Sequence, residues 1–273
     1  MYNQLHYYFS QNNILSECQF GFRQGKSTTT AVLEVVNSIL EAFEERKHVS
    51  LALLDLSKAF DCAHFSVILD KLQFYGMSNF SIKLVESYLQ NRKQFVSVKG
   101  KQSELLSVKV GVPQGSVLGP FFFIVAVNDL PYNVRAKTII YADDTTLLVA
   151  NRDRQVLEDL MREAQNAAFT WFSTNKLIAN PDKTQNIILS LGKETDIQSV
   201  KLLGIHIDSK LNWQTHINFL CKKLSRSSFL LWKLASFVTE EYLRSSYFAF
   251  FQSHIAYGIL IWGHATSVHK ILL

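Results

Sequence analysis

Apolar residues recur every three or four positions in several stretches of the chain, which is the spacing of a helix with one buried face. In 29–47 a stripe of aliphatic and phenylalanine side chains faces away from a row of glutamates. Ser57 is suited to cap a helix that continues to Tyr75, and Gly76 is suited to end it. The same spacing predicts helices over 81–89, 116–129 and 153–175, and a mostly helical segment from 212 onward.

Shorter apolar runs without that spacing predict β-strands. A buried strand is expected at 49–55, and 139–149 holds two strand-like runs on either side of a polar centre, which is typical of a hairpin. Strands and helices in this order indicate an α+β domain followed by a helical one, with a boundary near Ile207. Further strands are expected at 95–99 and 105–110, around a basic turn, and at 185–191 and 200–207.

The polar centre of 139–149 is an adjacent pair of acids, Asp143 and Asp144. Aspartate tolerates tight turns because it bonds its own backbone. Two carboxylates at one hairpin tip repel each other unless a cation neutralises them. Oxygen ligands of this kind suit Mg²⁺. The alternative is a solvated turn in which the two acids have no function. The pair alone does not decide between a metal site and such a turn.

A second acid, Asp55, ends the apolar run 49–55. It is expected at the carboxyl end of a strand, beside the tip that carries Asp143 and Asp144. Three acids from two elements are able to hold two metal ions, an arrangement that serves in-line phosphoryl transfer. The alternative is that Asp55 only caps a helix.

Composition limits the classes of protein to which the chain can belong but does not identify one. The chain has 273 residues, is 48% hydrophobic and carries a formal net charge of +5, which suits an anionic partner without requiring it. The cysteines, Cys18, Cys62 and Cys221, lack metal-ligand spacing and indicate reduced thiols. No secretory signal is visible, and the longest apolar stretch, 243–262, is interrupted by polar residues, so an intracellular protein without a membrane span is expected.

Several motifs, taken together, resemble the reverse transcriptases. Tyr141-Ala142-Asp143-Asp144 is similar to their catalytic box, 55–61 to their first carboxylate motif, and 111–120 to the segment between the two. The Gly-Phe-Arg at 21–23, the Lys-Ser-Thr-Thr-Thr at 26–30 and the Asn-Asp-Leu-Pro at 128–131 are most similar to non-LTR retrotransposons of the jockey-like, long-interspersed-element type. The motifs keep the family's order and span nearly the whole chain.

The resemblance implies the right-hand fold of polymerases. It places partial fingers and the palm in 1–207 and a partial, mostly helical thumb in 208–273. The family carries a basic finger hairpin upstream, which touches the incoming triphosphate, and that hairpin has no counterpart here. The chain is therefore expected to be truncated at its N-terminus, with Met1 an internal methionine of a longer reading frame.

The resemblance also implies an RNA-directed DNA polymerase that uses two Mg²⁺ ions. Its partners would be an RNA template, a DNA primer and deoxynucleoside triphosphates. By resemblance Asp55 and Asp143 are the main metal ligands and Asp144 is a more peripheral third acid. The backbone carbonyl of Leu56 is expected to join them.

Other side chains match positions that the family places around the nucleotide. Phe60 corresponds to the ring that excludes a 2′-hydroxyl, with core packing as the alternative. Gln114 and Gly115 correspond to the residues that touch the nucleotide and template. Tyr141 is expected near the primer end or in the core. Lys183 corresponds to a lysine that helps pyrophosphate leave, or it is a surface lysine in a turn.

Nucleic-acid contacts are expected at several further positions. Arg23 and Lys26 are able to reach phosphate, and a structural salt bridge is the alternative for Arg23. Gly204 lies in a string similar to the family's primer grip. One basic face of the last helical segment is expected to follow a duplex backbone, or to be simply solvated, and it comprises Lys222, Lys223 and Arg226.

Two classes of function remain open. The first is the polymerase core of a retrotransposon. The second is an inactive or domesticated remnant that at most binds nucleic acid. A mobile-intron or telomerase type of polymerase fits less well because of the motifs at 26–30 and 128–131. Oligomeric state is not determined by these patterns.

Overall fold

The computed structural model describes residues 1–190 and 197–265. They form two compact units, each assembled from separate stretches of chain. Unit 1 comprises Met1–Ser27, Ala52–Val149 and Glu158–Gln185. Unit 2 comprises Thr28–Leu51, Ala150–Leu157 and, as far as it is described, Asn186–Leu273. The division near Ile207 that the sequence suggests stays a prediction.

A four-stranded sheet, in the order β6-β7-β1-β8, carries the predicted acidic elements. Its strands are β1 (His48–Leu54), β6 (Lys137–Tyr141), β7 (Asp144–Asn151) and β8 (Gln185–Leu189). Strand β1 is buried over most of its length, as expected for a strand covered on both faces. Strands β6 and β7 pair as an antiparallel hairpin. The predicted strand at 49–55 and the predicted hairpin are thereby confirmed.

The helices of unit 1 pack around one apolar helix, α6 (Leu118–Val127), whose residues 121–127 are all buried. A helix that is apolar on every side belongs in a protein interior. It packs against α4 (Phe65–Phe74) and the short α3 (Ala59–Cys62). Helix α5 (Asn79–Leu89) follows α4 and is capped by the Ser78 hydroxyl. The remaining helices are α1 (Tyr2–Gln11), α7 (Leu130–Asn133) and α8 (Arg154–Thr174), the last of which starts in unit 2.

Buried polar groups fasten these helices together. Asn128, after α6, accepts a hydrogen bond from the Ser16 backbone at 2.8 Å and donates to the carbonyl of Ile14 at 2.9 Å. Nearby, the Lys71 ammonium donates to the Ala126 carbonyl at 2.6 Å and pairs with Asp129. Burial lowers the pKa of Lys71, and the bond to Asp129 opposes this effect. The Asn-Asp of the 128–131 motif therefore has a structural role.

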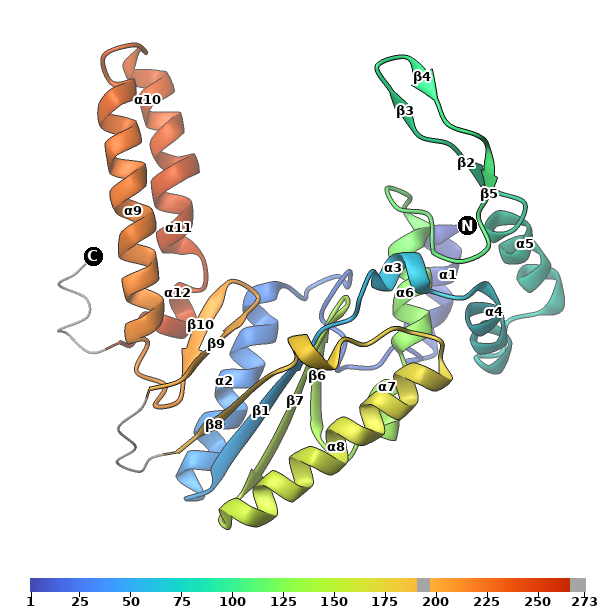
Figure 1. Ribbon diagram of the computed structural model, residues 1–273, viewed down its shortest axis with the longest axis horizontal. Helices are drawn as coiled ribbons and strands as arrows, with labels where there is room; N and C mark the ends of the chain where they lie inside the picture. Colours follow the sequence, from blue (N-terminus) through green and yellow to red (C-terminus); the bar gives the residue numbers. More distant parts are fainter. Residues whose placement is uncertain (191–196, 266–273) are drawn as a thin grey trace. The chain divides into compact units, whose positions relative to one another are not determined.

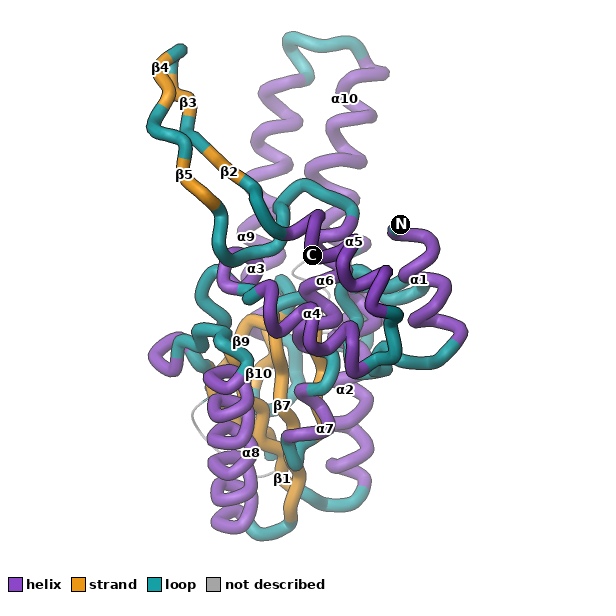
Figure 2. Tube along the Cα trace, turned by 90° about the vertical axis from the view of Figure 1, so that its right-hand side faces the viewer, coloured by secondary structure: helices purple, strands orange, loops and turns teal. Residues whose placement is uncertain are grey.

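A thin two-stranded ribbon extends from unit 1 after α5 (Figures 1 and 2). The ribbon is less regular than the two strands predicted for 95–99 and 105–110. Near its base β2 (Lys93–Gln94) pairs with β5 (Leu106–Ser107), and farther out β3 (Ser97–Val98) pairs with β4 (Lys101–Gln102). Between them the Ser103 hydroxyl accepts from the Val96 backbone at 2.9 Å, which interrupts the ladder.

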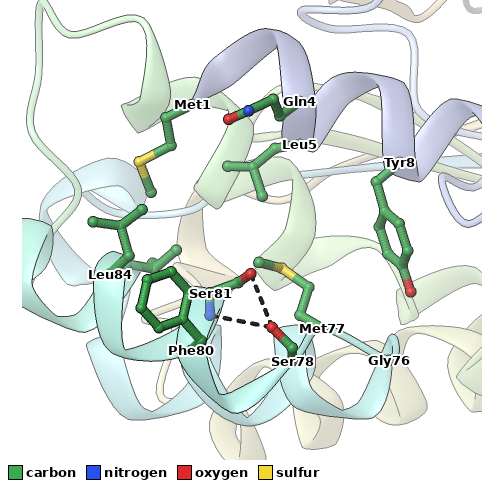
Figure 3. A pocket seen from close by; sticks show the side chains of 11 residues that line it. Met1, Gln4, Leu5, Tyr8, Gly76, Met77, Ser78, Phe80, Ser81 and Leu84 are labelled. Carbon is green, nitrogen blue, oxygen red and sulfur yellow. Dashed lines mark hydrogen bonds between the residues drawn. The ribbon is translucent and has the colours of Figure 1, made fainter.

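Unit 1 also contains an apolar cavity of about 530 Å³ between α1 and the start of α5. Figure 3 shows Met1 and Leu5 on one side of it, with Phe80 and Leu84 on the other. Ser78, which caps α5, and Ser81, which donates to it, also line this cavity. None of the site residues predicted from the sequence lines this cavity.

Unit 2 holds α2 (Thr28–Glu44) and a small hairpin of β9 (Ser199–Leu202) and β10 (Ile205–Asp208). The continuous strand predicted over 200–207 is therefore wrong. Leu203 and Gly204 both have positive φ, 45° and 88°, and form the two-residue turn between the strands. Positive φ at both positions is what a tight hairpin turn requires. The loop expected at 192–199 falls largely outside the described residues.

The segment after 212 is helical, as predicted. Helix α9 (Gln214–Leu234) packs beside α10 (Glu240–Tyr247), the π-helical turn η2 (Phe248–Gln252) and α11 (Ser253–Ala256) (Figure 1). A short helix, α12 (Ile259–Trp262), contacts α2. Among the described residues, no helix combines the length and the hydropathy that a bilayer crossing demands.

Candidate active site

The β6–β7 hairpin presents the acidic pair at its tip. Its last strand pair joins Tyr141, which is half-buried, to Asp144. Ala142 and Asp143 are therefore the two residues of the turn. Ala142 is buried and has a φ of 58°, a conformation that non-glycine residues rarely adopt. The acidic pair is thus divided between two positions, with Asp143 in the turn and Asp144 as the first residue of β7.

A buried glutamine holds this turn. Gln19 is 1% exposed, and its Oε1 accepts hydrogen bonds from the backbone N–H groups of Gly21 at 2.7 Å and Ala142 at 3.2 Å. Its own backbone forms a parallel bridge with Ile140 in β6. A Cβ on Gly21 would lie 2.3 Å from the Ala142 nitrogen, so this close approach requires glycine. The loop 19–21 therefore fixes the backbone that carries Asp143.

Asp55 directly follows strand β1. The chain beyond it stays extended, because Asn180 N donates to the Asp55 carbonyl at 3.0 Å and Leu56 forms an antiparallel bridge with Ala179. A 3₁₀ turn, η1 (Pro181–Lys183), follows and brings Lys183 Nζ to 3.4 Å from Asp55 Oδ2. Both side chains reach solvent, so the pair contributes only about 0–1 kcal/mol to stability. Two residues predicted for catalysis are thus in contact.

The charges of two of the acids act on the third. Loss of hydration raises the pKa of Asp144, and the negative charges of Asp143 and Asp55 raise it further. A bound cation would reverse this repulsion, and carboxylate oxygens are the donors that hard divalent ions prefer. The donor types fit a divalent metal. In the described part of the chain, however, no three His, Cys, Asp or Glu side chains already form a ligand cluster.

Phe60, in α3, has aromatic neighbours on two sides. Its ring stacks on that of Phe123 with centroids 4.4 Å apart and lies edge-on to Phe22 at 6.0 Å. Phe123 is buried, whereas Phe22 is exposed and has a φ of 54°. Phe60 itself stays partly exposed. The stacking on Phe123 agrees with the core packing considered as the alternative, and the 2′-hydroxyl gate stays a prediction.

The loop before α6 places Gln114 next to another acid. Gln114 Nε2 donates to Asp61 Oδ1 at 2.6 Å, and both side chains are exposed. Gly115 follows with a φ of 76°, which suits glycine. Ser116 Oγ donates to the Pro113 carbonyl at 2.7 Å and accepts from the backbone of α6 at 2.9 Å. The loop is therefore anchored to the helix that follows it.

Arg23 and Lys26 have protein partners. Both pair with Glu17, at 3.3 and 2.9 Å. Arg23 also donates to the Ser16 carbonyl at 2.6 Å, and Lys26 Nζ lies 4.5 Å from the centre of the Phe20 ring. The hydrogen bond from Lys26 holds the pKa of Glu17 below its ordinary value. The structural salt bridge considered for Arg23 is present, and phosphate contact stays a prediction.

Residues 1–220 match the model of one protein family, described as reverse transcriptase (RNA-dependent DNA polymerase). The chain belongs to the reverse transcriptase family. Curated relatives agree with the resemblance seen in the sequence. The chain is 29% identical to the probable RNA-directed DNA polymerase from transposon BS of Drosophila melanogaster, over 96% of this chain and 32% of the relative.

A second relative is the RNA-directed DNA polymerase from mobile element jockey of Drosophila melanogaster. It is 30% identical over 78% of this chain and 26% of its own length. This reverse transcriptase domain therefore spans about a third or less of the curated relatives it matches.

Solved structures support the right-hand fold. Apo telomerase from Candida tropicalis matches with a TM-score of 0.58 over 76% of this chain and 39% of that chain, at 12% identity. Telomerase from Candida albicans, in complex with a fragment of telomeric RNA, matches with a TM-score of 0.56 over 96% of this chain and 47% of that chain, at 13% identity. At such identities the likeness concerns the fold alone.

Unit 2 of this reverse transcriptase carries the remaining predicted positions. Gly204 lies in the β9–β10 turn, where the Tyr257 hydroxyl donates to the neighbouring Leu203 carbonyl at 2.5 Å. On α9 the Lys223 Nζ lies 4.9 Å from the centre of the Phe219 ring, and its positive charge acts on the buried His216. The exposed basic residues of that face are Lys222, Lys223 and Arg226.

Two residues at this site were absent from the sequence prediction, Gln19 and Asp61. Gln19 immediately precedes the Gly-Phe-Arg string, and Asp61 ends the first carboxylate motif. Proximity to those motifs is the signal that would have pointed to them. Their roles depend on bonds to Ala142 and Gln114, which lie far away in the sequence.

Proposed function

We propose that this chain forms the polymerase core of a non-LTR retrotransposon enzyme that copies RNA into DNA. The observation that carries the proposal is the placement of Asp55 and Asp143 at neighbouring strands of one sheet, where their negative charges help to raise the pKa of Asp144. Membership of the reverse transcriptase family supports it. The substrates, an RNA template, a DNA primer and deoxynucleoside triphosphates, are found inside cells, where we place the activity.

The reaction joins the primer 3′-hydroxyl to the α-phosphorus of a nucleotide and releases pyrophosphate. Little covalent work falls to the protein, so positioning and charge dominate catalysis. Asp55, Asp143 and Asp144 would hold two magnesium ions, together with the carbonyl oxygen of Leu56. Those ions, when bound, supply the positive charge that the attacking and leaving oxygens need.

The side chains around the acids would orient the nucleotide. The exposed part of Phe60 would exclude a 2′-hydroxyl, and its stacking on Phe123 would keep the ring from yielding. Gln114 would break its hydrogen bond to Asp61 and contact the nucleotide and the template. Gly115 would let the backbone come close, and Tyr141 would contact the primer end.

Lys183 would act on the leaving group. Its ammonium lies beside Asp55 and is exposed, so it is able to neutralise pyrophosphate or donate a proton to it. Arg23 and Lys26 would contact phosphate from within their pairing with Glu17. Gly204 and the basic face of α9 would follow the primer–template duplex.

Incorporation of labelled deoxynucleotides on an RNA template tests this proposal. We expect Mg²⁺-dependent synthesis from the jockey polymerase after its matching segment is replaced by residues 1–220 of this chain. Asp143→Asn should reduce it by about 10²–10³-fold or more, because transition-state charge is left uncompensated. Asp153→Asn, outside the site, is the matched control. No synthesis by the chimeric enzyme would favour a remnant that only binds nucleic acid.

A further inference from the structure

Phe22 combines two features that rarely occur together in one residue. Its side chain is 55% exposed, and its φ of 54° lies in the left-handed region. A bulky side chain is an outlier there, because its Cβ crowds the following carbonyl oxygen. A ring that is more than half exposed gains little from burial to offset this cost. Backbone strain of this kind persists where the surrounding structure imposes it, and it concentrates at functional sites.

The residues on either side of Phe22 are anchored and impose its conformation. Gly21 lies so close to the Ala142 backbone that a Cβ would not fit between them. On the other side, the Arg23 guanidinium donates to the Ser16 carbonyl at 2.6 Å. The chain is therefore tied down before and after Phe22, in the loop that also supports the acid-bearing turn.

The ring of Phe22 lies against Phe60, the proposed 2′-hydroxyl gate. The two ring centroids are 6.0 Å apart and the planes meet at 84°, which is an edge-to-face contact. Phe60 also stacks on the buried Phe123, at 4.4 Å and 26°. Its backbone is fixed as well, since Val112 N donates to the Phe60 carbonyl at 2.9 Å. Phe123 thus restrains the ring from the core, and Phe22 restrains it from the exposed loop.

A steric gate works only while its ring stays in place, because a ring that swings aside leaves room for the hydroxyl group that it should exclude. Resting on the proposed function, we infer that Phe22 is a positioning residue that holds Phe60 in place and thereby strengthens the preference for deoxynucleotides over ribonucleotides. The left-handed backbone at Phe22 is the means by which an exposed loop keeps an aromatic ring against Phe60.

Competing incorporation of the two kinds of nucleotide by the chimeric jockey enzyme that carries residues 1–220 tests this role. Phe22→Asn removes the ring and tolerates a positive φ. It should lower the preference for deoxynucleotides by roughly two- to tenfold, the worth of one aromatic pair. The fall should come from a raised kcat/KM for ribonucleotides, a gain that a misfolded protein cannot show. Phe22→Tyr keeps the ring and should retain the wild-type preference, and Phe74→Asn, at another exposed phenylalanine, is the matched control.

A double variant separates positioning from direct contact with the nucleotide. In the Phe60→Val background, Phe22→Asn should have no further effect on the preference, because no ring is left to hold. Thermal unfolding of residues 1–273 verifies that Phe22→Asn folds. Its Tm should stay near the wild-type value, since relief of the strained φ offsets the lost ring contact.

Three results with an active chimera would overturn the inference alone. The first is an unchanged preference in Phe22→Asn, and the second is an equal fall in Phe74→Asn. The third is a further fall in the Phe60→Val background, which would mean that Phe22 contacts the nucleotide itself. A chimera that makes no DNA at all would refute the proposed function, and this inference with it.

Discussion

At the scale of single residues, the conformation of the turn at Ala142 and Asp143 depends on Gln19. Replacing it with Met keeps its length but removes the acceptor for Gly21 N and Ala142 N. Each buried N–H left without a partner costs about 1–3 kcal/mol, so the loss of two such bonds in Gln19→Met should lower the free energy of unfolding by roughly 2–6 kcal/mol. In an active enzyme it should lower kcat more than it raises KM, because the position of Asp143 changes.

Denaturant unfolding and steady-state kinetics measure these effects. Gln24→Met, at an exposed position in the same loop region, is the control and should change neither. An unaltered kcat in Gln19→Met, despite reduced stability, would show that Gln19 serves the fold and not the placement of Asp143.

Phe60 is the second residue whose role its surroundings make testable. Shortening it to Val would remove the exposed part of the ring while Phe123 keeps the core filled. In an active enzyme we expect the preference for deoxynucleotides over ribonucleotides to fall by about ten- to a hundredfold, since that is the discrimination a steric contact supplies. Competing incorporation of the two nucleotides measures it. Phe74→Val, on the exposed end of α4, is the control, and unchanged selectivity in Phe60→Val would remove the gate assignment.

At the scale of elements, α9 and the β9–β10 hairpin share a buried histidine. His216 Nδ1 accepts from the His206 backbone at 3.4 Å, and the side chain lies beside Trp262. Burial lowers its pKa from 6.5 to about 4, and the positive charges of His206 and Lys223 contribute to the lowering. Because the unfolded chain takes up this proton at higher pH, the free energy of unfolding should fall as pH drops from 6.5 to 4 and level off above 7.

The expected loss is on the order of 3 kcal/mol. Urea unfolding of the wild type and of His216→Phe, which keeps an aromatic ring but does not titrate, isolates it from other acid-sensitive groups. The two proteins should differ most in their response between pH 4 and 6.5. If the unfolding free energies of the two proteins changed in parallel over that range, folded His216 would take up its proton despite its burial.

At the scale of the whole molecule, the basic face of α9 should bind nucleic acid as a duplex. This face is an exposed helix surface, which suits a duplex backbone. Replacing Lys222, Lys223 and Arg226 together by Gln should reduce the salt slope for a blunt duplex by roughly 0.9 for each phosphate that is no longer neutralised. It should leave single-stranded RNA binding nearly unchanged. Anisotropy titrations with both probes test this, and equal losses for the two would contradict a preference for the duplex.

The sequence by itself determined most elements of this protein, although the helix expected from Ser57 to Tyr75 is divided into α3 and α4 by the extended residues Ala63 and His64. The apolar run ending at Asp55, the hairpin around Asp143 and the amphipathic helices follow from local patterns, because burial of one face dictates the period of apolar residues. Family membership also came from short, ordered motifs. Local pattern failed at 200–207, where two positive φ angles at Leu203 and Gly204 convert one expected strand into a hairpin.

Tertiary structure decided what each functional residue touches. Gln19 bonds to Ala142 across 123 positions of the chain, and Gln114 to Asp61 across 53. Lys183 is next to Asp55 because the 178–180 segment pairs with the chain after β1. The loop 111–114 approaches α3 closely because Gly111 has no side chain. Such contacts arise from packing between distant segments, and a local pattern of apolar and polar residues carries no record of them.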